Sequence, residues 1–494
     1  MTAVRSQTVD APTDRRRWAA LVVLCVGMLM IVLDVTVVNV ALPSIQSDLG
    51  FTQSSLAWVV NAYLISFGGL LLLAGRLGDL VGRRRIFMIG LAVFTVASLL
   101  CGLAQSQAML IGARFAQGVG GALTSAVILG MIVTMFPEPK EQAKAIGIYG
   151  FVASAGGSIG LLAGGVLTDA INWHWIFFIN LPIAVGTALL AARLIDRDTG
   201  IGLGRGADVL GAGLVTGALM LAVYTIVKAS EYGWGSLHTV GLGAVSLVLL
   251  ACFVARQARG ANPLMPLRIF HSRNVAGANV VQVVVVAGMF GMFFMGTLYM
   301  ERVLGYSPLE IGLAFLPATL LMGVFSAILS APLNARFGAR GTLVPALGLV
   351  LGALVLFALA PVDGSYVSDV LPAAILIGVG AGLAFPSLMT LAMSGATPED
   401  AGLASGLINT TAQVGGALGL AVLATLASGR SEDLLAAGEA APQALTSGYH
   451  LAFAVGAALV LAGIAVALTV LAPERVAAEQ AAQRSAPKPA YAEG

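Results

Sequence analysis

The stretch "GRLGDLVGRRR", Gly75–Arg85, interrupts a chain that is otherwise overwhelmingly apolar. It places three glycines, four arginines and the acid Asp79 between two long hydrophobic runs. A second stretch, "PLNARFGAR", Pro332–Arg340, repeats its framework, with glycine and arginine at matching positions. The second copy has Ala335 where the first has Asp79. Two copies of one loop predict two halves of similar topology, an arrangement typical of transporters.

Composition assigns the rest of the chain to the lipid bilayer. Of 494 residues, 58% are hydrophobic and only 10% are charged, whereas soluble domains have about 25% charged residues. A bilayer core needs about 20 apolar residues per helix, and the sequence offers fourteen such runs. We therefore expect an all-α polytopic membrane protein. Its expected parts are a polar tail, a six-helix half, two extra helices, a second six-helix half and a final tail, at residues 1–17, 18–198, 199–260, 261–473 and 474–494.

Basic residues indicate how the helices alternate across the bilayer. With the N-terminus in the cytoplasm, nearly all of the 26 lysines and arginines fall on the cytoplasmic side. The exceptions are Lys228, Arg302 and Arg430 outside and Arg114 within a helix. This bias satisfies the positive-inside rule. An even number of crossings with both termini cytoplasmic follows, and we expect the bacterial inner membrane.

Several function classes lack their signatures. The net charge is +2 without a long basic cluster, so nucleic-acid binding is not expected. The three cysteines and four histidines lack ligand spacing, which leaves no expected metal site or disulfide. A P-loop is absent, as is any hydrolytic constellation. We expect neither an enzyme nor a bound cofactor.

The stretch "IVLDVTVVNVALP", Ile31–Pro43, places Asp34 deep in the first apolar run. An acid at the centre of a membrane helix costs at least about 2.5–3.5 kcal/mol and marks a functional site by default. The alternative is a helix-contact residue hydrogen-bonded to a neighbour. Arg114 is the one basic residue inside a predicted helix, and Gln117 lies on the same helix face. Its alternative is a structural charge satisfied by backbone carbonyls.

Four motifs together resemble the major facilitator superfamily. The loop Gly75–Arg85 resembles the loop motif of the superfamily, and "LIGARFAQGVGGA", Leu110–Ala122, resembles its motif with a buried arginine. "LDVTVVNVALP" and "GGSIGLLAGG", Gly156–Gly165, are similar to patterns of the fourteen-helix drug:proton antiporter branch. The likeness covers almost the whole chain except the tails. In the last motif Leu161 stands where a proline is usual.

The resemblance implies separate roles for these motifs in proton coupling and in gating. Asp34 and Arg114 become candidate partners for proton coupling, directly or through water or Gln117, because the family places their helices side by side. Gly156, Gly160 and Gly164 form a small-residue ridge that the resemblance expects to seal the outer face against a helix of the second half; ordinary helix contact is the alternative. The loop is expected to latch the halves in the outward-facing state through Gly75, Gly78, Asp79, Gly82, Arg83 and Arg84. A plain positive-inside loop is the other interpretation.

Residues that contact the substrate are harder to predict. Polar and methionine side chains on the expected cavity helices are the candidates, with helix contact and lipid contact as the alternative: Asn39, Trp58, Asn61, Gln117, Met292, Asn409 and Gln413. Methionine-rich surfaces adapt to varied apolar ligands. The expected substrate is a small apolar or cationic compound, and protons are the coupling ion. We expect substrate and proton to compete for the charge of Asp34.

The sequence thus predicts a proton-coupled antiporter that acts as a monomer and exports drugs or other small amphipathic compounds. One alternative is a dedicated exporter of a single metabolite or lipid on the same fold. Another is a membrane sensor or channel without coupled transport.

Overall fold

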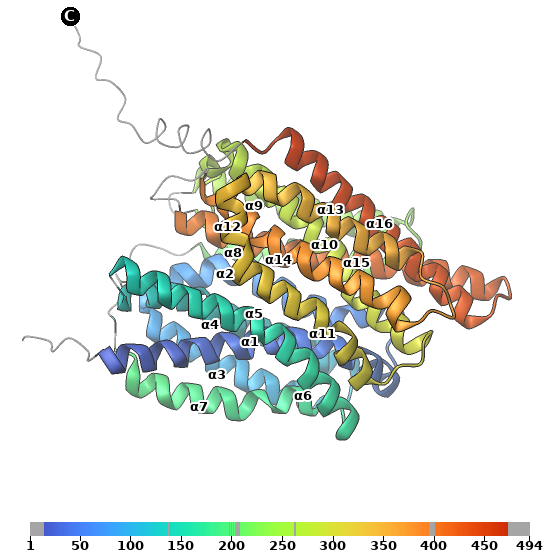
Figure 1. Ribbon diagram of the computed structural model, residues 1–494, viewed down its shortest axis with the longest axis horizontal. Coiled ribbons are helices and arrows are strands. Elements are labelled where there is room, and N and C mark those ends of the chain that lie inside the picture. Colours follow the sequence, from blue (N-terminus) through green and yellow to red (C-terminus); the bar gives the residue numbers. More distant parts are fainter. Residues whose placement is uncertain are drawn as a thin grey trace, which may run out of the picture.

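The computed structural model describes residues 14–136, 138–196, 198, 200, 202, 208–260, 263–394 and 401–472, and the regular secondary structure of these residues is all helical, without strands. Two helical bundles lie side by side (Figure 1). The first half holds α1 (Asp14–Leu49), α2 (Gln53–Val81), α3 (Arg83–Gly102), α4 (Gln107–Met135), α5 (Pro139–Ala170), α6 (Trp175–Phe178) and α7 (Asn180–Leu194). The second half holds α10 (Arg273–Arg302), α11 (Pro308–Val324), α12 (Ser330–Phe337), α13 (Ala339–Ala358), α14 (Leu371–Ser394), α15 (Ala401–Ala436) and α16 (Ala441–Thr469).

The helix count agrees with the fourteen predicted crossings. Thirteen helical segments are long and apolar enough to cross a membrane over their described residues. Three of these combine neighbouring elements. One joins α6 with α7, one joins α11 with α12 through a π-helical turn at Phe325–Leu329, and one joins a π-helical turn at Tyr366–Val370 with α14. The remaining crossing is α5, which is 32 residues long. The fold class is therefore confirmed.

Helix ends follow the local sequence. Thr52 and Ser55 form a capping box at the start of α2, and Ser307 and Glu310 form another at the start of α11. Such boxes satisfy backbone N–H groups that have no partner within the helix. The first helix differs from expectation, because it begins at Asp14 rather than after Arg17. Its basic residues extend the helix beyond the apolar run and reach neighbouring elements.

The described chain begins and ends at the same end of the bundle. Arg16 of α1 pairs with Asp196 after α7, and Arg273 at the start of α10 donates to the Thr469 carbonyl at the end of α16. We call this the Arg16 end, and the opposite end, where α1 approaches α10 through Gln46, the Gln46 end. An even number of crossings follows. The last tail, 474–494, lies outside the described residues.

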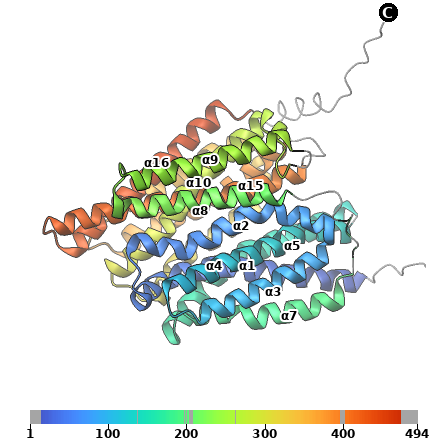
Figure 2. The same ribbon diagram turned by 180° about the vertical axis from the view of Figure 1, so that it is seen from behind.

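The two extra helices, α8 (Val209–Tyr232) and α9 (Leu237–Arg259), form a hairpin beside the seam between the halves. In Figure 2, α8 runs along α2 and α15, with α9 against its outer side. The hydroxyl of Thr425 in α15 donates to the Ile226 carbonyl of α8 over 3.3 Å. The hairpin therefore touches both halves rather than acting as a loose linker.

A polar cluster fixes the Arg16 end of this hairpin. Asp208 caps α8 by accepting from the Gly211 N–H over 2.8 Å, and it also accepts from Arg256 and Gln257 of α9. Gln257 in turn accepts from the Met265 N–H in the segment before α10. Burial raises the pKa of Asp208, but these hydrogen bonds outweigh it, so the pKa lies below the ordinary value.

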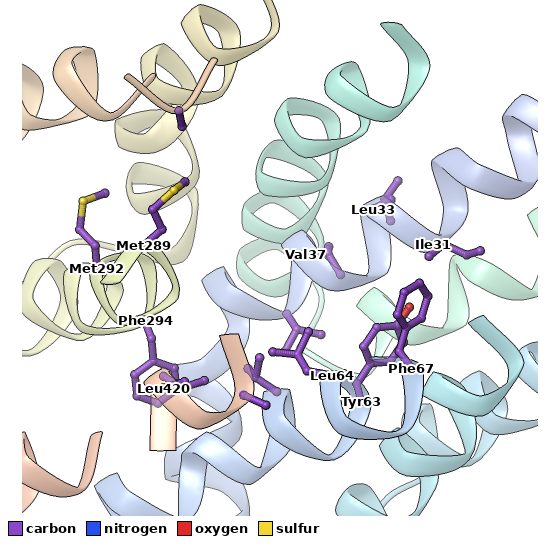
Figure 3. Packing of buried hydrophobic residues seen from close by; sticks show 14 of the residues in the cluster. Ile31, Leu33, Val37, Tyr63, Leu64, Phe67, Met289, Met292, Phe294 and Leu420 are labelled. Carbon is purple, nitrogen blue, oxygen red and sulfur yellow. The ribbon is translucent and has the colours of Figure 1, made fainter. Parts of the chain in front are cut away.

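The interior is continuous and apolar across both halves. Figure 3 shows part of it: Tyr63 and Leu64 come from α2, Leu420 from α15, and Met292 and Phe294 from α10. All belong to one cluster of buried hydrophobic residues. Because lipid offers no hydrophobic driving force between helices, close apolar fit and small residues hold such bundles together.

Candidate functional site

The carboxylate of Asp34 lies at the centre of a buried polar cluster in the first half. The residue is 0% exposed. Its Oδ2 accepts from Arg114 Nη1 over 2.6 Å. Its Oδ1 accepts from Gln117 Nε2 over 2.6 Å and from Asn180 Nδ2 over 2.9 Å. Both oxygens thus accept hydrogen bonds, from three donors in all, an arrangement that suits the ionised carboxylate.

Arg114 is held from several sides. It lies on α4 and is 1% exposed. Its Nε donates to the Val59 carbonyl of α2 over 2.9 Å. The guanidinium lies over the Tyr63 ring, 4.5 Å from its centroid, a favourable cation–π position. The expected contact between Asp34 and Arg114 is therefore a direct ion pair.

Gln117 connects this pair to α3. Its Nε2 donates to Ser98 Oγ over 2.9 Å, besides its bond to Asp34. Its Oε1 accepts from Arg114 Nη1 over 2.7 Å and from the Cys101 thiol. The side chain of Gln117, predicted as a substrate contact, is 0% exposed and makes these bonds within the first half, so that role stays a prediction. Its helix face turns toward α1 and α3, away from the other half.

Asn180 is the member of the cluster that sequence reasoning missed. It is the first residue of α7, directly after the short helix α6, and is 0% exposed. One signal was available in the stretch "FINLP", Phe178–Pro182. There Asn180 is an isolated amide in an apolar run, and a proline follows two residues later. Proline favours the first turn of a helix. The amide thus enters the interior where the chain restarts as α7.

The other predicted substrate contacts do not gather in one place. Asn61 is 0% exposed, and both of its amide atoms lack hydrogen-bond partners among the described residues. Gln413 of α15 packs on Gly68 of α2, where an added Cβ would lie 2.6 Å from that of Gln413. Asn61 lies seven residues before Gly68 and therefore on the same face of α2. Both side chains belong to the seam between the halves.

The remaining candidates lie in different surroundings. Met292 of α10 is 0% exposed within the apolar interior. Asn39 donates to the Val35 carbonyl of its own helix over 3.4 Å. Trp58 is half-buried, and Asn409 is exposed. Asn61 and Gln413 thus lie on two helices, α2 and α15, that contact each other across the seam. The substrate role of all of these residues stays a prediction.

The loop between α2 and α3 is tied to its own half. Arg83 pairs with Asp79 over 3.1 Å and also donates to the Gly130 carbonyl and Thr134 Oγ1 of α4. Gly82 adopts φ +111°, a conformation that favours glycine. Gly78 allows α2 to approach α4 closely, since a Cβ there would lie 2.5 Å from Val127.

A further acid completes this loop. The Asp198 carboxylate accepts from the backbone N–H groups of Arg83 and Arg84 at the start of α3. Arg84 also donates to the Ala192 carbonyl of α7. Among the described residues, none has an atom within 4 Å of a Cβ added at Gly75. These contacts join α2, α3, α4 and α7, so the latch between the halves stays a prediction for another conformation.

The predicted glycine ridge faces a different helix than expected. A Cβ added at Gly156, Gly160 or Gly164 would meet Val32, Thr36 or Val37 of α1, at 3.1 Å or less. The expected contact with the second half is wrong for these residues. The adjacent stripe of α5 contacts the second half instead. Gly165 lies against Pro308 and Leu309 of α11, and the Leu161 carbonyl lies against Gly312. A shift of one residue turns a helical stripe by about 100°.

Two helical halves joined at a seam, with a buried charge pair inside one of them, define a polytopic membrane transporter. The sequence profile of the Major Facilitator Superfamily matches residues 24–420. The chain belongs to this family, and the predicted membership is confirmed.

Named relatives share nearly the full length. The puromycin resistance protein pur8 of Streptomyces alboniger is 40% identical over 94% of this chain and 93% of its own. The cephamycin export protein CmcT of Amycolatopsis lactamdurans is 40% identical over 95% of this chain and 96% of its own. The multidrug resistance protein Stp of Mycobacterium tuberculosis is 33% identical over 84% of this chain and 76% of its own. Such relatives agree with the predicted drug:proton antiporter branch, and the chain is a transporter rather than an enzyme.

Solved structures agree on the fold. A bacterial homologue of the human lysosomal transporter Spinster, in an inward-facing and unoccupied conformation, matches with a TM-score of 0.62 and 16% identity, over 97% of this chain and 100% of that one. A mutant form of the nucleoside transporter NupG matches with a TM-score of 0.63 and 11% identity, over 92% of this chain and 99% of that one. At these identities the likeness supports the fold alone.

Proposed function

We propose that this protein is a secondary active exporter that moves small amphipathic compounds of drug or antibiotic type out of the cell in exchange for protons. Export is supported by relatives named for resistance and export. Proton coupling is supported by one observation, the buried ion pair of Asp34 and Arg114. The proposed setting is the bacterial inner membrane with the Arg16 end in the cytoplasm, and the proposed working unit is a monomer.

The cost of this pair argues for a functional role. Replacing a buried ion pair by apolar residues is often neutral or stabilising, whereas removing one partner costs about 3–5 kcal/mol. The pair is therefore a poor device for stability alone. Protonation of Asp34 removes the charge that balances Arg114, so in this proposal it favours a different arrangement of α1, α4 and α7. Proton binding can in this way bias the arrangement of a whole half.

Substrate and proton are held at different places in this proposal. Asp34 is sealed inside the first half, while Gln413 packs on Gly68 at the seam between the halves, and Asn61 shares that face of α2. A cationic substrate therefore does not reach the carboxylate directly, which revises the expected competition for one charge. We infer that coupling passes through α1, which contacts α4 and α7 on one side and α10 and α11 on the other.

A dedicated exporter of one metabolite is the second candidate. It is favoured by relatives whose names each specify a single compound, puromycin or cephamycin. A competition panel of unrelated drugs separates the two, because only a broad pump is inhibited by many of them. A sensor or channel would show no accumulation against a gradient.

The decisive experiment uses inverted membrane vesicles acidified inside, with accumulation of a fluorescent drug as the readout. Asp34→Asn copies the protonated shape but cannot titrate, so gradient-driven accumulation should be lost while drug binding persists. Asp34→Glu keeps the titration with a longer arm and should lose less. Full gradient-driven accumulation in Asp34→Asn would show that the proton travels elsewhere.

A further inference from the structure

The three donors around Asp34 are not equivalent. Arg114 is cationic and can only donate. Gln117 is fully committed: its Nε2 serves Asp34 and Ser98, and its Oε1 serves Arg114 and Cys101. Turning the Gln117 amide over would place its Oε1 against Asp34 Oδ1 and its Nε2 against Arg114 Nη1, an acceptor against an acceptor and a donor against a donor. Neither side chain can adapt to a carboxylic acid in place of a carboxylate.

Asn180 is the exception. Its Nδ2 donates to Asp34 Oδ1 over 2.9 Å. Its Oδ1 is buried and has no hydrogen-bond partner among the described residues. A buried carbonyl oxygen without a partner is unfavourable and calls for an explanation. The two ends of an amide are nearly equal in size, so turning it over needs almost no extra room.

We propose that Asn180 is a positioning residue that serves both protonation states of Asp34. The inference rests on the proposed role of Asp34 in proton coupling. With the carboxylate, the amide donates through Nδ2. When a proton binds to Oδ1 of Asp34, the amide turns over and its Oδ1 accepts the new O–H. No covalent bond changes other than the O–H bond that forms, and Arg114 keeps its contacts with the Val59 carbonyl and Gln117.

The electrostatic surroundings leave this task to Asn180. Arg114 from α4 is the charged group that faces Asp34 among the described residues. Tyr63 from α2 and Cys101 from α3 also face the cluster, and such groups are ordinarily uncharged at neutral pH. The neighbouring α5, α6, α7, α10 and α11 bring no charged side chain to Asp34 over their described residues. Asn180 is thus the neutral group with a spare acceptor beside the carboxyl.

The test compares Asn180→Leu, which has similar volume but neither donor nor acceptor, with Asn180→Ser, whose hydroxyl can donate or accept. The matched control is Thr187→Val, a buried position on the same helix whose hydroxyl donates to the Ile183 carbonyl of its own helix. The first readout is the infrared C=O band of the protonated acid, assigned to Asp34 by its loss in Asp34→Asn. The second is gradient-driven accumulation in vesicles.

If Asn180 serves both states, Asn180→Leu shifts the acid band, because the acid loses its hydrogen bond, while the pH midpoint of the band moves by less than about one unit. Accumulation should fall by about tenfold or more, because a small displacement of a working group is costly. Asn180→Ser should restore the band and most of the rate, and Thr187→Val should leave the band in place.

Two results overturn the inference. If Asn180→Leu leaves the acid band in place but moves its midpoint by more than about one unit, Asn180 serves the carboxylate only. If it changes neither band nor midpoint, the residue is merely structural. Should Asn180→Leu fail to accumulate in membranes, Asn180→Ala supplies the same loss of groups. Failure of the proposed function looks different. Asp34→Asn would then transport normally, while Asn180→Leu, in a protein that keeps Asp34, would still shift the acid band.

Discussion

Gly165 of α5 lies so close to α11 that a Cβ on it would stand 2.9 Å from the Pro308 carbonyl oxygen. One helical turn earlier on α5, the carbonyl oxygen of Leu161 lies 2.7 Å from the position that a Cβ on Gly312 of α11 would occupy. Arg302 of α10 reaches Gln46 of α1 at the same end, over 3.0 Å. The halves are thus joined at the Gln46 end, and glycine on both sides of the contact sets how close they come.

This contact predicts that even a small side chain added at Gly165 strongly reduces transport. Gly165→Val should reduce gradient-driven transport by at least about tenfold, because backbone on the facing helix cannot move aside cheaply and a small displacement of working groups is costly. Gly186→Val is the control, since nothing lies within 4 Å of a Cβ there. Equal transport by both variants, at equal membrane levels, would contradict the role of this contact.

Removing the cation of the buried pair should destabilise the protein. Arg114→Gln leaves the Asp34 carboxylate buried without its counter-charge, so the free energy of unfolding should fall by about 3–5 kcal/mol. The double variant Asp34→Asn with Arg114→Gln should recover much of this stability while remaining inactive in transport. Thermal melting of purified protein measures the first effect and vesicle accumulation the second. Additive losses in the double variant would show that the two charges are not coupled.

The exposed pair of Asp79 and Arg83 should matter for turnover more than for stability. Their side chains are 45% and 34% exposed, and such pairs contribute about 0–1 kcal/mol. Asp79→Asn should therefore melt normally but transport more slowly. Arg83→Gln should slow transport further, because Arg83 also holds Gly130 and Thr134. Unchanged initial rates in both variants would reduce this loop to a positive-inside signal.

The Asp208 cluster should make stability depend on pH. The pKa of Asp208 lies below its ordinary value of 3.8. A lowered pKa in the folded state contributes stability above the ordinary pKa, and this stability is lost as pH falls through the folded-state pKa. Asp208→Asn should therefore melt at a lower temperature than the parent at pH 7, with the gap closing as acid is added. A gap that is the same at every pH would contradict this.

Sidedness follows from the two ends of the bundle. We expect Arg193→Cys, at the Arg16 end, to react with an impermeant thiol reagent only after cells are opened. Glu439→Cys, beside the turn between α15 and α16 at the opposite end, should react in intact cells. The exposed Cys252 is replaced first in both proteins to remove background labelling. The reverse pattern would invert the orientation, and labelling of both from outside would break the even-crossing topology.

The sequence by itself determined the fold class and the main charge pair. Runs of about 20 apolar residues fix the number of crossings, because every backbone group in lipid must be satisfied within a helix. Asp34 and Arg114 stood out since ionisable residues are rare in such runs. They were predicted as partners, directly or through water or Gln117, once the resemblance had placed their helices together. Membership of the superfamily followed from the same motifs.

Only the tertiary structure decided which side chains complete the site and which stripe joins the halves. Asn180 is far from Asp34 in sequence, and nothing in a single helix shows that α7 restarts beside α1 and α4. The glycine ridge was placed on the wrong partner because Gly156, Gly160 and Gly164 share one face of α5, while Leu161 and Gly165 share the next. Periodicity reveals that a face is smooth, but the rotation of each helix about its axis is set by contacts with all of its neighbours at once.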